Sequence, residues 1–257
     1  MAEKNDRSPL HTAARERKVA IADGLLKTNP KLSQKKDDDG RYAIHWAASS
    51  NCLDIVVMLA NQSSFDPDVQ DGSGWTPLMI AASVPESDDV IKVLLKAGAD
   101  VNEKSAPPLP FIQASPTSSN LAPTDNGGQT ALHLVASKQN LDTARLLLEH
   151  KASTRVRDRR GQYPLHRAAA VGSAPMCRLL LGKLSPTNPQ DVEGYTPLHH
   201  AVAEGHGDAA VALLKEGADP TAENAQGERP LDLAPDKEMR TYILRGAERE
   251  GIDLEGQ

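Results

Sequence analysis

One apolar position returns along this 257-residue chain at a nearly constant interval. Of its six intervals, five are 33 or 34 residues long and one is 54, and the position is occupied by Leu10, Ile44, Leu78, Leu132, Leu165, Leu198 and Leu231. Self-similarity at a fixed period of about 20–50 residues is typical of repeat architectures, in which each unit buries its apolar face against its neighbours. The chain is therefore predicted to fold as a stack of seven units.

The clearest unit is GYTPLHHAVAEGHGDAAVALLKEGAD, residues 194–219. Thr196 suits the N-cap of a helix and Pro197 its first position, where a missing N–H costs nothing. Gly205 separates this helix from a second one, and Gly217 suits a left-handed C-cap. Each unit is thus predicted to be a helix, a turn, a second helix and a loop. With its period and its T-P-L-H-x-A signature, the unit is similar to an ankyrin repeat.

The predicted fold class is an all-α ankyrin-repeat solenoid that forms a single domain over residues 1–257. Its repeats are expected to begin near residues 8, 40, 74, 128, 161, 194 and 227. In the first repeat, Ser8 is expected to cap a helix and Ile21 to be buried. Residues 235–250 are expected to close the stack as a C-terminal cap with a polar outer face.

The 54-residue interval indicates an inserted loop at residues 104–124. This segment contains five prolines and four serines and lacks helical periodicity. Such a composition is typical of disordered, protease-sensitive segments. Deletion of the insertion is therefore expected to leave the fold intact.

Composition limits the classes of partner. The formal net charge is −6, so nucleic acid is not an expected partner. No apolar run is long enough to span a membrane, and a soluble monomer in the cytoplasm and nucleus is expected. Cys52 and Cys177 lie far apart without a paired motif, which favours buried, reduced thiols.

Five of the eight histidines occupy the same position of the repeat, namely His11, His45, His133, His166 and His199. A shared position indicates a structural role, in which each imidazole hydrogen-bonds loop backbone of its own and the next unit. His200 and His206 are expected to be surface residues. No zinc-ligand spacing, phosphate-binding loop or catalytic signature is present, so neither metal, cofactor nor enzymatic activity is expected.

Four segments extend the resemblance beyond a general ankyrin pattern: DDDGRYAIHWAAS (37–49), DGSGWTPLMIAAS (71–83), LHRAAAVGS (165–173) and AVAEGHGDAAVALL (201–214). Together they resemble the gankyrin family, including its fungal members, whereas the insertion at 104–124 departs from that family. The resemblance implies an assembly chaperone of the proteasome regulatory particle. It also implies a partner, the C-terminal domain of one AAA-type ATPase subunit, and basic contacts at Arg41 and Lys138 with an acidic contact at Glu204.

Repeat geometry selects the side chains that can face a binding groove, at the loop position after each glycine, after the histidine, and at the end of the first helix. The predicted protein-binding residues are Arg41, Trp46, Trp75, Lys138, Arg167, Tyr195, His200, Glu204 and Glu228. For the two tryptophans, ordinary packing is the alternative interpretation. For the whole chain, the alternatives are a general ankyrin adaptor, an inhibitor of a kinase or transcription factor, or an enzyme accessory or hydrolase domain.

Overall fold

The computed structural model describes residues 8–105 and 127–254. In these ranges the regular structure is helical apart from one isolated bridge between Lys36 and Tyr42. The chain divides into two compact units, residues 1–131 and 132–257. The all-helical fold class is confirmed, whereas a single continuous domain stays a prediction.

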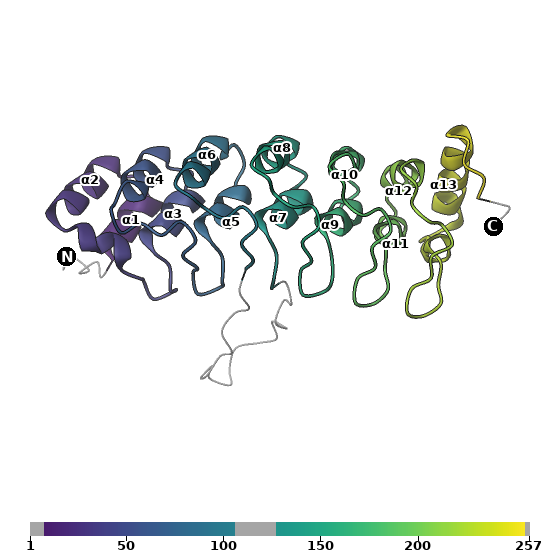
Figure 1. Ribbon diagram of the computed structural model, residues 1–257, viewed down its shortest axis with the longest axis horizontal. Helices are drawn as coiled ribbons and strands as arrows, with labels where there is room; N and C mark the ends of the chain where they lie inside the picture. The colour runs from purple at the N-terminus through teal and green to yellow at the C-terminus, as the bar shows by residue number, and fades with distance from the viewer. Residues whose placement is uncertain (1–7, 106–126, 255–257) are drawn as a thin grey trace. The chain divides into compact units, whose positions relative to one another are not determined.

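The N-terminal unit contains three helix pairs, each followed by a loop (Figure 1). Its elements are α1 (Pro9–Arg15), α2 (Val19–Thr28), the 3₁₀ helix η1 (Pro30–Gln34), α3 (Ala43–Ser49), α4 (Leu53–Ala60), α5 (Pro77–Ala82) and α6 (Asp88–Lys96). First helices pack on first helices, α1 on α3 and α3 on α5, and second helices pack on second helices. The core between these two layers is formed by buried aliphatic side chains, among them Leu10, Ile55, Leu59, Leu78, Ile91 and Leu94.

The C-terminal unit continues the same pattern. Its elements are α7 (Ala131–Lys138), α8 (Leu141–Glu149), α9 (Pro164–Ala170), α10 (Ala174–Leu181), α11 (Pro197–Ala203), α12 (Gly207–Lys215), η2 (Pro230–Leu233) and α13 (Lys237–Arg249). Within this unit, the loops that precede α9, α11 and η2 project from the same side of the helices (Figure 1).

The helix start predicted at Thr196 and Pro197 is confirmed. Thr196 adopts extended backbone, its hydroxyl accepts the His199 N–H, and Pro197 is the first residue of α11. Gly205 and Gly217 both have positive φ, as the turn and the C-cap require. Both cysteines are buried as predicted, and burial raises the pKa of the Cys177 thiol to about 12.

Two expectations for the first repeat were wrong. Ile21 is 51% exposed, although the equivalent Ile55 one repeat later is buried. Ile55 belongs to α4, which packs against the preceding second helix, α2. Ile21 belongs to α2, and among the described residues no second helix precedes α2 to cover it. Ser8 precedes α1 with φ −138° and ψ 61°, and its side chain forms no cap hydrogen bond.

The seventh repeat differs from the others, because its first helix is the short 3₁₀ helix η2. Ala234 leaves the helix with φ −60° and ψ 128°. The next residue is Pro235, and a residue that precedes proline is disfavoured in the α region. The predicted C-terminal cap corresponds to α13, which packs on α12.

The predicted insertion, residues 104–124, lies largely outside the described residues. The described residues on either side of it are hydrogen-bonded to each other. Ser105 N–H donates to the Gln129 carbonyl (2.8 Å), and Gly128 N–H donates to the Ser105 carbonyl (2.8 Å). Ser105 Oγ also accepts the Gln129 N–H at 3.1 Å. The chain therefore leaves the repeat and returns to it at one place.

Candidate protein-binding loops

The repeated histidines join each repeat to the loop that follows it. Nδ1 of His45, His166 and His199 accepts a backbone N–H from the N-cap residue of its own helix, at 3.0–3.1 Å. This bond leaves Nε2 to carry the proton, and Nε2 lies 3.1–3.2 Å from a carbonyl oxygen of the next loop. His133 and His11 reach the next loop through Nε2 in the same way. The structural role predicted for this position is confirmed.

Three of these imidazoles, those of His45, His166 and His199, are held neutral. Burial lowers the pKa of His45 and of His199, and it lowers the pKa of His166 to about 3. Protonation of Nδ1 would also convert an acceptor of a backbone N–H into a donor. The neutral form is thus the one that connects neighbouring repeats.

A second repeated feature is a hydrogen-bonding pattern within the loops. An aspartate or asparagine stands three residues before the loop glycine, and its Oδ1 accepts the backbone N–H groups of the residues two and four positions later. This pattern occurs at Asp37, Asp71, Asp158, Asp191 and Asn224, with distances of 2.9–3.1 Å. Each loop is therefore closed around one side-chain oxygen.

In the N-terminal unit, the other carboxylate oxygen of these aspartates holds predicted binding residues. Asp37 Oδ2 accepts the indole N–H of Trp46 at 2.6 Å, and Asp71 Oδ2 accepts Arg41 Nε at 3.1 Å. The Arg41 guanidinium also lies 4.8 Å from the centre of the Trp46 ring, and that of Arg15 lies 5.6 Å from it. Arg41 and Trp46 thus form one fixed cluster, and Trp46 is half-buried beneath two cations.

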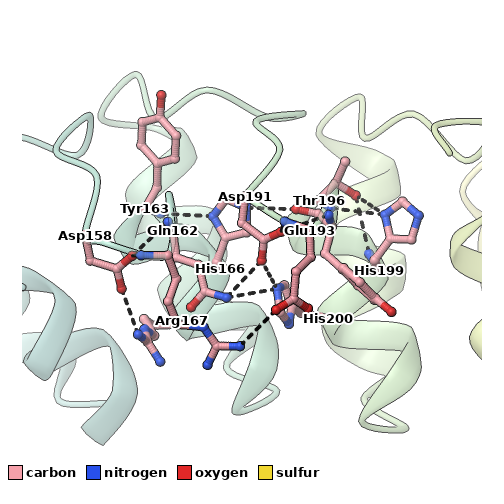
Figure 2. A network of polar contacts seen from close by, with 12 residues as sticks. Asp158, Gln162, Tyr163, His166, Arg167, Asp191, Glu193, Thr196, His199 and His200 are labelled. Carbon is pink, nitrogen blue, oxygen red and sulfur yellow. Dashed lines mark hydrogen bonds and ion pairs between the residues drawn. The ribbon is translucent and has the colours of Figure 1, made fainter. Parts of the chain in front are cut away.

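The C-terminal unit contains the corresponding network, in which Asp158 holds Arg167 and Asp191 lies between Gln162 and His200 (Figure 2). Arg167 Nη2 donates to Asp158 Oδ2 at 2.7 Å. Asp191 Oδ2 accepts from Gln162 Nε2 at 2.9 Å and contacts His200 Nε2 at 3.0 Å. Hydrogen bonds of this kind fix the rotamers of Arg167 and His200 before any partner binds.

Burial and hydrogen bonding act in opposite directions on the Asp191 carboxyl. Burial by itself would raise the pKa of Asp191, but hydrogen bonds from His200, Gln162 and the Tyr195 N–H lower it well below the usual range. The same balance lowers the pKa of Asp37, through Trp46 and backbone N–H groups. Both carboxylates are ionised at neutral pH, so the loops contain fixed negative charges beneath partly exposed side chains.

The side chains held in this way remain open to solvent in part. The exposed fractions are 30% for the Arg41 side chain, 18% for Arg167 and 20% for His200. Tyr195 is half-buried, with its ring centre 5.6 Å from those of both His199 and His200. His200 is therefore no simple surface residue, and that part of the sequence interpretation was wrong.

The remaining predicted binding residues are not part of these clusters. Lys138 ends α7 and Glu204 follows α11, and both are exposed. Trp75 is half-buried and is tied through its backbone N–H to Asp71. Glu228 accepts a hydrogen bond from Asn224 Nδ2 at 2.9 Å.

The loop aspartates were missed by the sequence interpretation, although a signal was present. An aspartate or asparagine precedes the glycine by three residues at Gly40, Gly74, Gly161, Gly194 and Gly227. Such residues accept hydrogen bonds from nearby backbone N–H groups and favour turns. The second role of Asp37, Asp158 and Asp191, as partners of a side chain nine residues later, requires the three-dimensional turn.

Within residues 8–105 and 127–254, no cluster of three or more histidine, cysteine or acidic side chains has a geometry that could hold a metal ion. No helix in the same ranges is both long enough and apolar enough to cross a membrane.

The two layers of helices and the loops with fixed side chains define a helical repeat protein of the kind that presents a surface to other macromolecules. The family model for ankyrin repeats matches three stretches, residues 10–105, 112–191 and 152–224. The chain belongs to the ankyrin-repeat family.

Two relatives carry names that refer to the proteasome. The chain is 38% identical over 154 residues to the probable 26S proteasome regulatory subunit p28 of Saccharomyces cerevisiae, an alignment that covers 59% of each protein. It is 37% identical over 65 residues to the 26S proteasome non-ATPase regulatory subunit 10 of Dictyostelium discoideum, covering 25% of this chain and 28% of that protein. The match to p28 confirms the resemblance to the gankyrin family, although the chain spans less than two thirds of either relative.

Among solved structures, the ankyrin repeat domain of human ASB11 is similar with a TM-score of 0.75. The alignment covers 93% of this chain and 98% of that one, at 22% sequence identity. At this identity the likeness concerns the fold alone.

Proposed function

We propose that this protein is a non-catalytic assembly chaperone of the proteasome regulatory particle. In this proposal its loops and first helices bind the C-terminal domain of one AAA-type ATPase subunit, in the cytoplasm and nucleus. The observation that carries the proposal is the similarity to p28 over 154 residues, because it adds a proteasome-associated relative to a fold that many unrelated binding proteins share.

The geometry of the loops supports a binding role. Arg41, Trp46, Arg167 and His200 are held by buried or half-buried carboxylates and are still partly exposed. Side chains whose rotamers are fixed before association lose less conformational entropy on binding. Arginine and aromatic residues are also enriched among the side chains that dominate interface energies.

The charges provide the test of the partner. Lys138 and Glu204 are exposed and differ in sign, and the partner is proposed to carry the opposite charges. Lys138→Glu and Glu204→Lys should each weaken binding of the purified ATPase C-terminal domain, by about 2 kcal/mol if the charge is desolvated in the complex. Isothermal titration calorimetry measures this loss directly.

Arg41 requires a milder substitution. A glutamate at this position would lie beside Asp71, whose side chain is only 2% exposed, and would disturb the loop. Arg41→Gln removes the charge but keeps hydrogen-bonding capacity, so it should weaken binding with a smaller effect on folding. Lys92→Glu is the control, because Lys92 is an exposed residue of the second-helix layer. If Arg41→Gln, Lys138→Glu and Glu204→Lys all bind like the wild type, the proposed partner or the proposed binding face is wrong.

The alternative functions predict different results. A general ankyrin adaptor or an inhibitor of a kinase or transcription factor would not bind the ATPase domain in the titration. Affinity purification from the organism's own extract, followed by mass spectrometry, would then recover signalling proteins in place of proteasome base subunits.

A further inference from the structure

The loop between α8 and α9 carries an unusual concentration of positive charge. Residues 150–163 contain five arginine or lysine residues and one acidic residue, a formal charge of +4 in a chain whose formal net charge is −6. Most of this charge lies in the sequence RVRDRR, residues 155–160, which we call the arginine loop.

Exposure alternates along the arginine loop. Arg155, Arg157 and Arg159 are exposed, whereas Val156 is half-buried and Asp158 is buried. The alternation follows from Asp158, whose Oδ1 accepts the N–H groups of residues 160 and 162 at 2.9 Å and whose Oδ2 binds the Arg167 guanidinium. The buried carboxylate thus fixes a loop that presents every second side chain to solvent, and each of those side chains is an arginine.

The fold uses only part of this charge. Arg157 Nε donates to the Tyr163 hydroxyl at 2.8 Å, with its guanidinium 5.1 Å from the centre of that ring. Arg160 pairs with Glu193 at the long distance of 3.8 Å. Within the described residues, the guanidinium groups of Arg155 and Arg159 form no hydrogen bond or ion pair. Internal packing therefore does not account for these two cations.

We propose that the arginine loop is a docking surface for a short acidic segment of a partner protein. Guanidinium groups present planar pairs of donors that match carboxylates, and alternate side chains of an extended acidic segment would meet alternate arginines. This inference does not depend on the ATPase partner proposed above, since Arg155, Arg157 and Arg159 are not among the residues proposed to contact that partner.

A protein segment fits the surroundings of the loop better than nucleic acid does. The neighbouring loop is joined to the arginine loop by the Val192 N–H, which donates to the Arg160 carbonyl at 2.9 Å. That neighbouring loop carries the exposed Glu193. A phosphate backbone, which bears a charge at every nucleotide, would meet this carboxylate as it continued past the arginines. A short acidic segment can end before it reaches Glu193.

The test measures fluorescence anisotropy of a labelled peptide of alternating glutamate and serine residues with the full-length protein. The wild type should bind this peptide, more weakly as salt is raised. Replacing Arg155, Arg157 and Arg159 together with glutamine should weaken binding about tenfold, the size expected for the loss of three exposed charge pairs. Circular dichroism should be unchanged because Asp158 and its partners remain, and the thermal midpoint should fall only slightly with the loss of the Arg157–Tyr163 contact.

The matched control removes the same charge elsewhere in the C-terminal unit, by replacing the exposed Arg178, Arg229 and Arg245 with glutamine. It should change the affinity for the peptide less than twofold. Equal weakening by the two triple variants would show attraction by net charge alone and would overturn the proposal, as would the absence of binding to the wild type.

Two further measurements identify the occupant. A labelled oligothymidylate that binds the arginine loop as tightly as the acidic peptide would assign the loop to polyanions in general and overturn the choice of a protein segment. Sedimentation analysis of the protein alone is the other measurement. Self-association that disappears in the arginine-loop variant would assign the loop to a second copy of this chain and would equally overturn the proposal.

Discussion

A single imidazole connects each of five repeats to the loop that follows it. The position of these histidines in the repeat was sufficient to predict their role, because the same residue type at the same place in five units requires a shared cause. Their partners are carbonyl oxygens 24–30 residues further along the chain, so the local sequence alone does not identify them.

At His166 the consequence can be measured. His166→Ala should lower the free energy of unfolding by about 1–3 kcal/mol, because the Tyr163 N–H and the Tyr195 carbonyl both lose their partner in a buried place. Urea denaturation followed by circular dichroism gives this value. His150→Ala, at the exposed histidine that follows α8, should have almost no effect. An unchanged urea midpoint for His166→Ala would contradict the structural role.

The side-chain partners of the loop carboxylates could not be predicted from the sequence. Arg41, Trp46, Arg167 and His200 were selected by repeat position, and the structure places them on buried or half-buried carboxylates. His200 was expected to be a surface residue without a partner in the fold, because no pattern in the sequence shows that the Asp191 turn directs its second oxygen at the ring. Whether these side chains contact a partner stays a prediction.

Among the elements, the helix pairs were predictable from glycine, proline and the apolar period, and the ends of the array were not. Ile21 is exposed because burial in a repeat depends on a neighbour and not on the residue itself. The first helix of the seventh repeat is the short 3₁₀ helix η2, because Ala234 precedes Pro235 and is therefore disfavoured in the α region.

The connection between α6 and α7 should tolerate shortening. Replacing residues 106–126 with a short glycine-serine linker should leave the thermal midpoint of the protein nearly unchanged. Ser105 already holds Gly128 and Gln129 through three hydrogen bonds, and shortening a closed loop changes its closure entropy only slowly. Differential scanning calorimetry measures the midpoint.

The control for this replacement is Ser105→Ala, which removes one of those bonds but no residue of the loop. It should cost more stability than the replacement does. A marked loss of the cooperative transition in the shortened protein would show that residues 106–126 contribute to the fold.

For the whole molecule, the neutral histidines predict a loss of stability in mild acid. The folded-state pKa of His45, His166 and His199 lies below the ordinary value of 6.5, so below that pH the unfolded chain binds more protons than the folded one. The stability that these groups provide is complete above pH 6.5 and is lost as the pH falls towards the folded-state values. Because the pKa of His166 falls to about 3, this residue alone should cost about 2 kcal/mol at about pH 5.

Urea midpoints measured at about pH 7 and about pH 5 test this expectation. The wild type should show a clearly lower midpoint at the more acidic pH. His166→Gln, which is destabilised at both pH values, should lose less between them. Equal losses in the two proteins would mean that other groups cause the acid sensitivity.

The histidine connections also determine how either unit would respond to tension. Each connection extends only from one repeat to the next loop, and helices pack on the helices of adjacent repeats. Force applied along the row of repeats in the C-terminal unit would therefore load its interfaces in series, and each would have to yield separately. We therefore expect such a unit to extend under load one repeat at a time.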